Sequence, residues 1–299
     1  MTSKNFQLVR WMGMVLAFAA SATLSQAQTN AACTFSFFQL SGTITNPQGN
    51  HAFGVNSFAT VVGQGETSMN VEKGFVRYSN GGTNYYSNLT FAARNDNGVS
   101  VGTYVPSGSS TAEGFMLKGS TVTPIKDPNP NGIDGTHATG INKWTSIVGW
   151  YGDPNRNIHG FKRFSNGSYN TLNFPGAQAT MPAGINDSGT IVGTISDFAG
   201  SHGFIYSSGK WAKVDYPGGT AGTTQLLGIS NGNVILGLST STESGFTFIY
   251  SNGKFKVISD SKAAGGVFAN GIAANGLITG DAYMQPNTAS WNGFLASCK

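Results

Sequence analysis

The sequence predicts an all-β fold built from tandem repeats, and three observations support this prediction. The chain has 42 glycines in 299 residues and only 10% charged residues, a composition that favours short strands joined by tight turns. A Gly-Ile-Asn tripeptide, or a relative of it, recurs about every 39 to 47 residues. A Gly-Phe step that opens a strand follows most copies about 20 residues later. Together these features predict a six-bladed β-propeller of four-stranded repeats.

The repeat units start near residues 54, 93, 140, 184, 228 and 271, and we expect them to form a single propeller domain over 28–299. In the fourth unit, the pattern predicts a first strand ending at Ile185 and later strands at 190–195, 202–207 and 210–216. An open solenoid is the structural alternative, but it needs capping repeats at its two ends.

The two ends of the chain instead predict a closed ring. The sixth unit reaches Cys298 without a fourth strand, whereas residues 34–40 form a strand-like segment that precedes the first unit. Cys33 lies just before this segment, and Cys298 occupies the place of the missing turn. We therefore expect the N-terminal strand to complete the last blade and a Cys33–Cys298 disulfide to replace the turn. Two free thiols are the alternative.

Residues 1–27 resemble a secretory signal peptide. Lys4 and Arg10 precede a short apolar run over 11–22, and Ser25-Gln26-Ala27 fits a cleavage site. We expect a secreted protein, either extracellular or periplasmic, with no membrane span, because the apolar run is shorter than about 20 residues. A lipid anchor on Cys33 is disfavoured because no large aliphatic residue stands in 30–32.

The charge pattern argues against nucleic acid as a partner. Without Lys4 and Arg10, 15 of the 17 basic residues remain against 13 acidic ones, and no basic cluster exists. We expect a monomer.

One family resemblance stands out. Residues 184–193, with His202-Gly203-Phe204 and 216–219, resemble the extracellular HAF-type repeat of bacteria, and 140–176 are similar. The resemblance implies secretion and tandem strand-rich repeats, and it implies no catalytic residues. Other residues replace the histidine in four units, so we do not expect a ring of identical sites. These replacements are Lys73, Glu113, Phe246 and Asn292.

The candidate binding residues lie in the variable loops between second and third strands, where aromatic and polar side chains are combined as sugars require. They are Trp150, Tyr151, Asp153, Arg156, His159, Asp197, His202, Tyr283 and Trp291. Aromatic residues that seal contacts between blades are the structural alternative. The equivalent positions of His159 and His202 favour a structural role, with a bond to a backbone carbonyl, over a role in binding or catalysis.

The sequence predicts no cofactor, no metal site and no catalytic residues. No HExxH pair is present, and the Gly228-Ile229-Ser230-Asn231-Gly232 match to a nucleophile motif falls at a β-turn. Residues 127–134 resemble a calcium loop but lack the closing glutamate, so calcium remains a weak alternative.

The leading functional hypothesis is therefore a non-enzymatic binding module for a glycan or another cell-surface component. A hydrolase or lyase acting on polysaccharide is the alternative, because the ring could bring two carboxylates together. A purely structural envelope protein is a third possibility.

Overall fold

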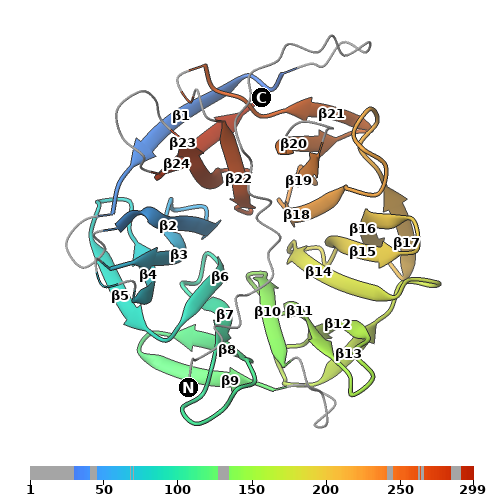
Figure 1. Ribbon diagram of the computed structural model, residues 1–299, viewed down its shortest axis with the longest axis horizontal. Helices are drawn as coiled ribbons and strands as arrows, with labels where there is room; N and C mark the ends of the chain where they lie inside the picture. The colour runs from blue at the N-terminus through green and yellow to red at the C-terminus, as the bar shows by residue number, and fades with distance from the viewer. Residues whose placement is uncertain are drawn as a thin grey trace.

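The computed structural model describes residues 30–40, 46–67, 69, 71–126, 135–240, 245–261, 263, 266–283 and 291–299. These residues form β-strands and no α-helix, and the described part of the chain contains no helix that could cross a membrane. The sheets surround a central axis as in a propeller (Figure 1). The expected signal peptide at 1–27 and the weak calcium candidate at 127–134 lie outside the described residues.

The strands follow the predicted repeat, and we number the units in chain order. Unit 1 contains β2 (Asn46–Val55), β3 (Val61–Glu66), β4 (Glu72–Arg77) and β5 (Thr83–Ser87). Unit 2 contains β6 (Thr90–Arg94), β7 (Ser100–Tyr104), β8 (Glu113–Lys118) and β9 (Thr121–Ile125). Unit 3 contains β10 (Thr136–Ile141), β11 (Ile147–Gly152), β12 (Ile158–Arg163) and β13 (Tyr169–Leu172).

The remaining units continue the pattern. Unit 4 contains β14 (Ala179–Ile185), β15 (Ile191–Asp197), β16 (Gly200–Ser207) and β17 (Lys210–Val214). Unit 5 contains β18 (Gln225–Ile229), β19 (Ile235–Thr240), β20 (Gly245–Ser251) and β21 (Lys254–Val257). Unit 6 contains β22 (Val267–Ile272), β23 (Ile278–Tyr283) and β24 (Trp291–Cys298), and it is completed by β1 (Cys33–Phe38).

The prediction of six separate blades is wrong in one respect. Four sheets of four strands stand separately, but units 3 and 4 belong to one eight-stranded sheet. The join is a single parallel pairing of Ile158 at the start of β12 with Ala179 at the start of β14. The connection after β13 brings the chain of unit 4 close enough to β12 for this pairing, and no local pattern in the sequence encodes that distance.

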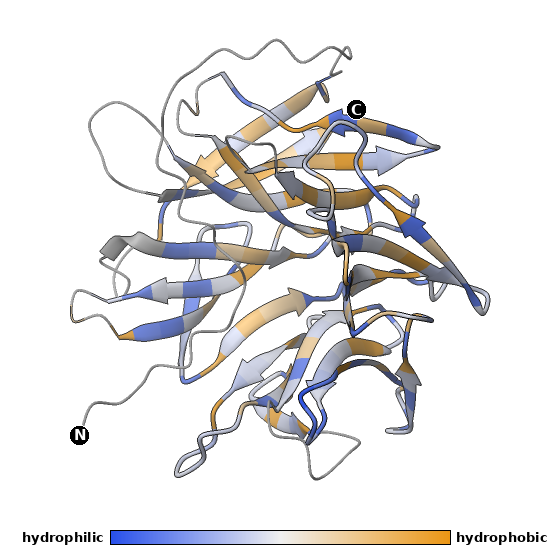
Figure 2. Ribbon diagram, turned by 45° about the vertical axis from the view of Figure 1, so that its right-hand side comes forward, coloured by the Kyte–Doolittle hydropathy of each residue, from blue (hydrophilic) through white to orange (hydrophobic). Residues whose placement is uncertain are grey.

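A cross-strand Gly–Phe pair forms the centre of every unit. The phenylalanine of each third strand lies opposite the glycine of the second strand, as in Gly193 and Phe204. A Cβ at Gly193 would collide with the carbonyl oxygen of Met181 in the first strand and press on the Phe204 ring. All six phenylalanines are at most 1% exposed. They are Phe75, Phe115, Phe161, Phe204, Phe248 and Phe294. Hydrophilic and hydrophobic segments alternate along the strands (Figure 2).

A ladder of asparagines connects the inner turns of neighbouring units. In unit 3, Asn142 Oδ1 accepts the backbone N–H groups of Trp144 (3.1 Å) and Ser146 (3.0 Å). Its Nδ2 donates to the backbone carbonyl of Asn186 in unit 4 (3.1 Å). The repeated Asn thus closes its own turn and holds the next unit. The equivalent residues act in the same way: Asn56, Asn95 and Asn186.

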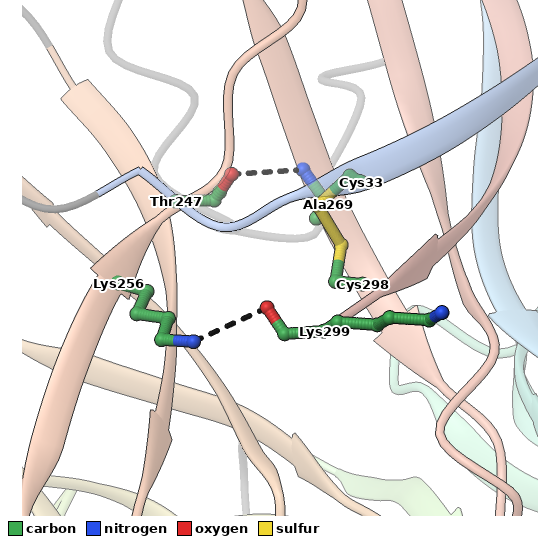
Figure 3. Close-up of a disulfide and its surroundings, with 6 residues drawn as sticks. All are labelled: Cys33, Thr247, Lys256, Ala269, Cys298 and Lys299. Atoms are coloured by element: carbon green, nitrogen blue, oxygen red, sulfur yellow. Dashed lines mark hydrogen bonds between the residues drawn. A yellow bond between two sulfur atoms is a disulfide. The ribbon is translucent and has the colours of Figure 1, made fainter.

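The ring closes as predicted. Strand β1 pairs antiparallel with β24 along its whole length, from Cys33 opposite Cys298 to Phe38 opposite Gly293. A Cys33–Cys298 disulfide joins the two strands where the other units have a turn (Figure 3). Beside it, Lys299 N–H donates to the Ala32 carbonyl (2.9 Å), and Lys256 Nζ donates to the Lys299 carbonyl (3.2 Å). The first and last described strands therefore form one covalently closed sheet.

Candidate binding face

Loops between second and third strands share one face with the connections that leave the fourth strands, because the strands of each unit alternate in direction. The connections also pack against these loops. The Gln178 N–H donates to the Ser196 carbonyl (2.9 Å), and the Ser201 N–H donates to the Gly222 carbonyl (2.8 Å). Side chains from both kinds of segment can therefore meet, and we call this surface the loop face.

In unit 3, the loop face carries a polar cluster centred on Asp153. Asp153 Oδ1 accepts the backbone N–H groups of Asn155 and Asn157, both at 2.8 Å. Asp153 Oδ2 accepts Asn157 Nδ2 (2.9 Å) and lies 3.2 Å from His159 Nε2. The other ring nitrogen, His159 Nδ1, lies 3.0 Å from Asn173 Oδ1, just beyond β13. The histidine thus ties the loop to the connection.

These hydrogen bonds stabilise the ionised form of the Asp153 side chain relative to the protonated form. Together the hydrogen bonds lower the pKa of Asp153 from 3.8 to about 2, and the Asn157 side-chain amide is the largest cause. Backbone N–H groups and His159 act in the same direction.

We expect an NMR titration of the Asp153 carboxyl group to give a midpoint near pH 2. Because the folded pKa lies below the ordinary value, the stabilisation of this loop is present above about pH 4 and is lost as the pH falls towards 2. In an Asn157→Ala variant the midpoint should move up towards 3.8, since the largest cause is removed. A wild-type midpoint near 4 would contradict the described loop geometry.

Unit 4 repeats the cluster with more charge. His202 is 6% exposed, and its Nδ1 lies 2.7 Å from Asp215 Oδ1, just beyond β17. Asp197 Oδ1 lies 3.3 Å from His202 Nε2, and Asp197 Oδ2 accepts Lys213 Nζ (3.1 Å). The pKa of Asp197 is lowered, first by the backbone N–H of Ala199 and then by Lys213.

Unit 2 fills the same positions with different charges. Glu113 replaces the histidine, accepts the Tyr104 hydroxyl at Oε2 (3.0 Å) and lies 3.9 Å from Lys126 Nζ. Partial burial, followed by the bond to Glu113, raises the pKa of Tyr104. In units 2 to 4 the loop face therefore presents different chemical groups on one repeated frame.

The structure brings some of the predicted residues together and separates others. Asp153 meets His159, and Asp197 meets His202, but each pair stays within its own unit. Both histidines face side-chain oxygens, so the expected bond to a backbone carbonyl is wrong. The register of the third and fourth strands places Asn173 and Asp215 beside the imidazole rings.

The predicted aromatic side chains are less exposed to a ligand in solvent than the loop pattern indicates. Tyr151 is 6% exposed and packs in the core, because it alternates with Trp150 along β11. Trp150 is half-buried and stacks on His137 with ring centres 3.8 Å apart. Tyr283 is also partly buried at the end of β23, and Trp291 begins β24. Arg156 is exposed at the tip of the unit 3 loop, where its φ is 66°.

Sequence reasoning missed three residues of this face. Asn173, Lys213 and Asp215 come from the end of the fourth strand and the connection after it. Asn173, Asp215 and, in unit 2, Lys126 share one repeat position directly after the fourth strand, and this recurrence of polar residues was the available signal. Phe198, which the sequence already places in the variable loop of unit 4 with Asp197 and His202, is 95% exposed at the tip of the β15–β16 hairpin.

Comparisons with known proteins support the fold. No protein-family model matches the chain, and no curated protein matches it. A protein of unknown function from Dyadobacter fermentans aligns with a TM-score of 0.51 at 8% identity, over 86% of this chain and 97% of its own. A variant of AofleA from Arthrobotrys oligospora gives 0.51 at 10% identity, over 91% and 90%.

A third similar structure is a variant of the Aleuria aurantia lectin in complex with α-methyl-L-fucoside. It gives a TM-score of 0.51 at 11% identity, over 83% of this chain and 93% of its own. At such low identity these likenesses show a shared all-β propeller architecture.

Proposed function

We propose that this chain is a secreted carbohydrate-binding protein that recognises its ligand with the loop face of units 3 and 4. The observation that carries the proposal is Phe198, whose side chain is 95% exposed beside the polar cluster of unit 4. Its ring can stack on the apolar face of a sugar. The Asp197 carboxylate of the same hairpin and the Lys213 ammonium group of neighbouring β17 can bond sugar hydroxyls.

The hairpin holds Phe198 in a defined position. Asp197 pairs with Gly200 across the turn, and Asp197 Oδ1 accepts the Ala199 N–H (2.8 Å). Fixing the turn before binding reduces the entropy that a ligand must overcome. A large apolar side chain on such a rigid, solvent-exposed tip adds no stability to the fold. It is suited to contact an external ligand.

The comparison with the lectin supports this proposal at the level of architecture, because that structure contains a bound fucoside. Secretion is part of the proposal too. It rests on the signal-like residues 1–27 and on the disulfide, which persists in oxidising compartments. We also propose that the eight-stranded sheet acts as two blades, giving six in all, and that the chain belongs with the HAF-type repeats.

On a glycan array followed by calorimetry with the bound glycans, Phe198→Ala should weaken binding at least about fivefold, since an exposed aromatic anchor contributes more than about 1 kcal/mol. The matched control is Phe58→Ala, because Phe58 is 66% exposed in the β2–β3 turn on the opposite face. Binding by Phe198→Ala equal to that of wild type, or binding to no glycan, would overturn the proposal.

The glycans that bind on the array can also be used to distinguish a binding protein from an enzyme. Incubation of the purified chain with polysaccharides, followed by a reducing-sugar assay and a measurement of unsaturated products, should show no release. Release that depends on a carboxylate of the loop face would establish the hydrolase or lyase alternative instead.

A further inference from the structure

The turns between first and second strands lie on the face opposite to the loop face, and we call that surface the turn face. Two residues after the ladder asparagine or its replacement, this turn carries an aromatic residue in only two units. They are Phe58 in unit 1 and Trp144 in unit 3, whereas the other units have Asn97, Ser188, Gly232 and Asn275. Four units form the turn without an aromatic ring, so the fold does not require one there. Trp144 is nevertheless 62% exposed.

Hydrogen bonds between neighbouring turns make the turn face around Trp144 rigid. Asn97 Nδ2 in unit 2 donates to the Lys143 carbonyl in unit 3 (2.8 Å). The Lys143 N–H donates to Asp187 Oδ1 in unit 4 (2.9 Å), and the Asp187 N–H donates to Asn231 Oδ1 in unit 5 (3.0 Å). Four consecutive turns are therefore joined by bonds that do not involve the ladder asparagines.

The indole of Trp144 is fixed on this frame with one face open. Its Nε1–H donates to the Asp187 carbonyl (3.1 Å), which satisfies the only polar group of the ring. Lys143 Nζ lies over the ring, 4.7 Å from its centre. Because one face lies under this ammonium group, an exposed fraction of 62% places the opposite face in solvent. A ring already held in this way loses little entropy when a ligand binds.

Polar groups beside the indole can bond the hydroxyls of a stacked sugar. Lys143 Nζ lies 3.5 Å from Asp187 Oδ2, and an ammonium group has three donors, so others are left for a ligand. Asn97 uses its Nδ2 on the Lys143 carbonyl, and its Oδ1 remains as an acceptor on an exposed side chain. An apolar ring next to a donor and an acceptor suits a pyranose, which has apolar faces and a polar rim.

We propose that Trp144, Lys143 and Asn97 form a second carbohydrate-binding site on the turn face. Its ligand class is an extended β-1,4-linked chain of glucose or N-acetylglucosamine units. The ring substituents of these sugars are equatorial, so both faces of each ring can stack, and the tip of a turn gives an extended chain an open surface. The site rests on the proposed function only in taking carbohydrate as the ligand class, and it does not involve Phe198. With sites on opposite faces, one molecule can link two polysaccharide chains.

Unit 1 supplies a matched control at the same turn position. Phe58 is 66% exposed, close to the value for Trp144. Its ring has no N–H group, so it cannot be held as the indole is. Ser57 stands where unit 3 has Lys143, so no ammonium group from the same turn lies beside the ring. We expect Phe58→Ala to leave binding on the turn face unchanged.

Isothermal titration of the Phe198→Ala protein, whose loop-face site is impaired, with chitohexaose and with cellohexaose tests the proposal. We expect one site per chain for at least one hexaose. Adding Trp144→Ala should weaken binding at least about fivefold, and adding Lys143→Met about two- to tenfold. The bound hexaose should also protect tryptophan fluorescence from acrylamide, and this protection should disappear with Trp144→Ala. Circular dichroism checks that each variant is folded.

The outcomes separate the two proposals. If wild type binds a hexaose and the Phe198→Ala protein binds neither, the turn-face site is wrong and the loop-face proposal stands. If Trp144→Ala removes hexaose binding while Phe198→Ala changes binding to no glycan on the array, the turn-face site stands and the loop-face proposal fails. Equal losses in Trp144→Ala and Phe58→Ala would show non-specific adsorption to exposed aromatic rings and would overturn the turn-face site.

Discussion

Replacing Cys33 and Cys298 together by serine is expected to lower the free energy of unfolding by about 3 to 5 kcal/mol. The disulfide links residues that are 265 positions apart, so it removes a large amount of chain entropy from the unfolded state. In its absence, β1 is held by its pairing with β24, by the packing of its phenylalanines and by the backbone bonds of Ala31 and Ala32 just before it.

Urea unfolding followed by tryptophan fluorescence measures this effect. Wild-type protein in a reducing agent should match the double variant, because these are the only two cysteines in the sequence. Hydrogen exchange adds local information: the amides of Phe35 and Phe37 in β1 should lose protection before those of the inner strands. A change below about 1 kcal/mol would show that the strand pairing alone closes the ring.

Asn142→Ala is expected to lower the free energy of unfolding by about 2 to 4 kcal/mol. The substitution removes two bonds to the turn of unit 3 and one bond to unit 4, and Asn142 is 5% exposed. Asn142→Ser should cost less, because Ser230 at the same position in unit 5 still accepts the N–H of Val234 (3.1 Å).

The control for this ladder is Asn166→Ala. Asn166 also accepts a backbone N–H, that of Ser168 (3.0 Å), but it lies in an exposed turn and its described hydrogen bonds stay within that turn. We expect a cost below about 1 kcal/mol there. If urea unfolding gave the two alanine variants equal stabilities, the bond between units would contribute nothing measurable.

The sequence predicted the features that depend on short, repeated patterns. The strands of unit 4, the pairing of β1 with β24 and the disulfide are all confirmed. Each follows from the alternation of side chains or from comparison of one repeat with another. The number of separate sheets was wrong because one pairing, between Ile158 and Ala179, depends on how two units approach each other.

The candidate site was harder to predict for a similar reason. A loop sequence shows that Tyr151 is aromatic, but only the direction of β11 shows that the ring enters the core. Likewise, Asp215 lies 13 residues after His202 in the chain, and only the pairing of β16 with β17 makes them neighbours. Comparison of the repeats identified the positions of the site residues. The contacts between their side chains depend on the register of the paired strands, which the repeat pattern does not give.

The closure of the ring also determines the order in which this chain can finish folding. Strand β1 is made about 265 residues before its partner cysteine, which at 5 to 20 residues per second is a delay of about 10 to 50 seconds. During that time its three phenylalanines, Phe35, Phe37 and Phe38, have no sheet to join. The earliest strand to be synthesised is thus the latest to be placed, and it must be kept from pairing with other chains until β24 arrives.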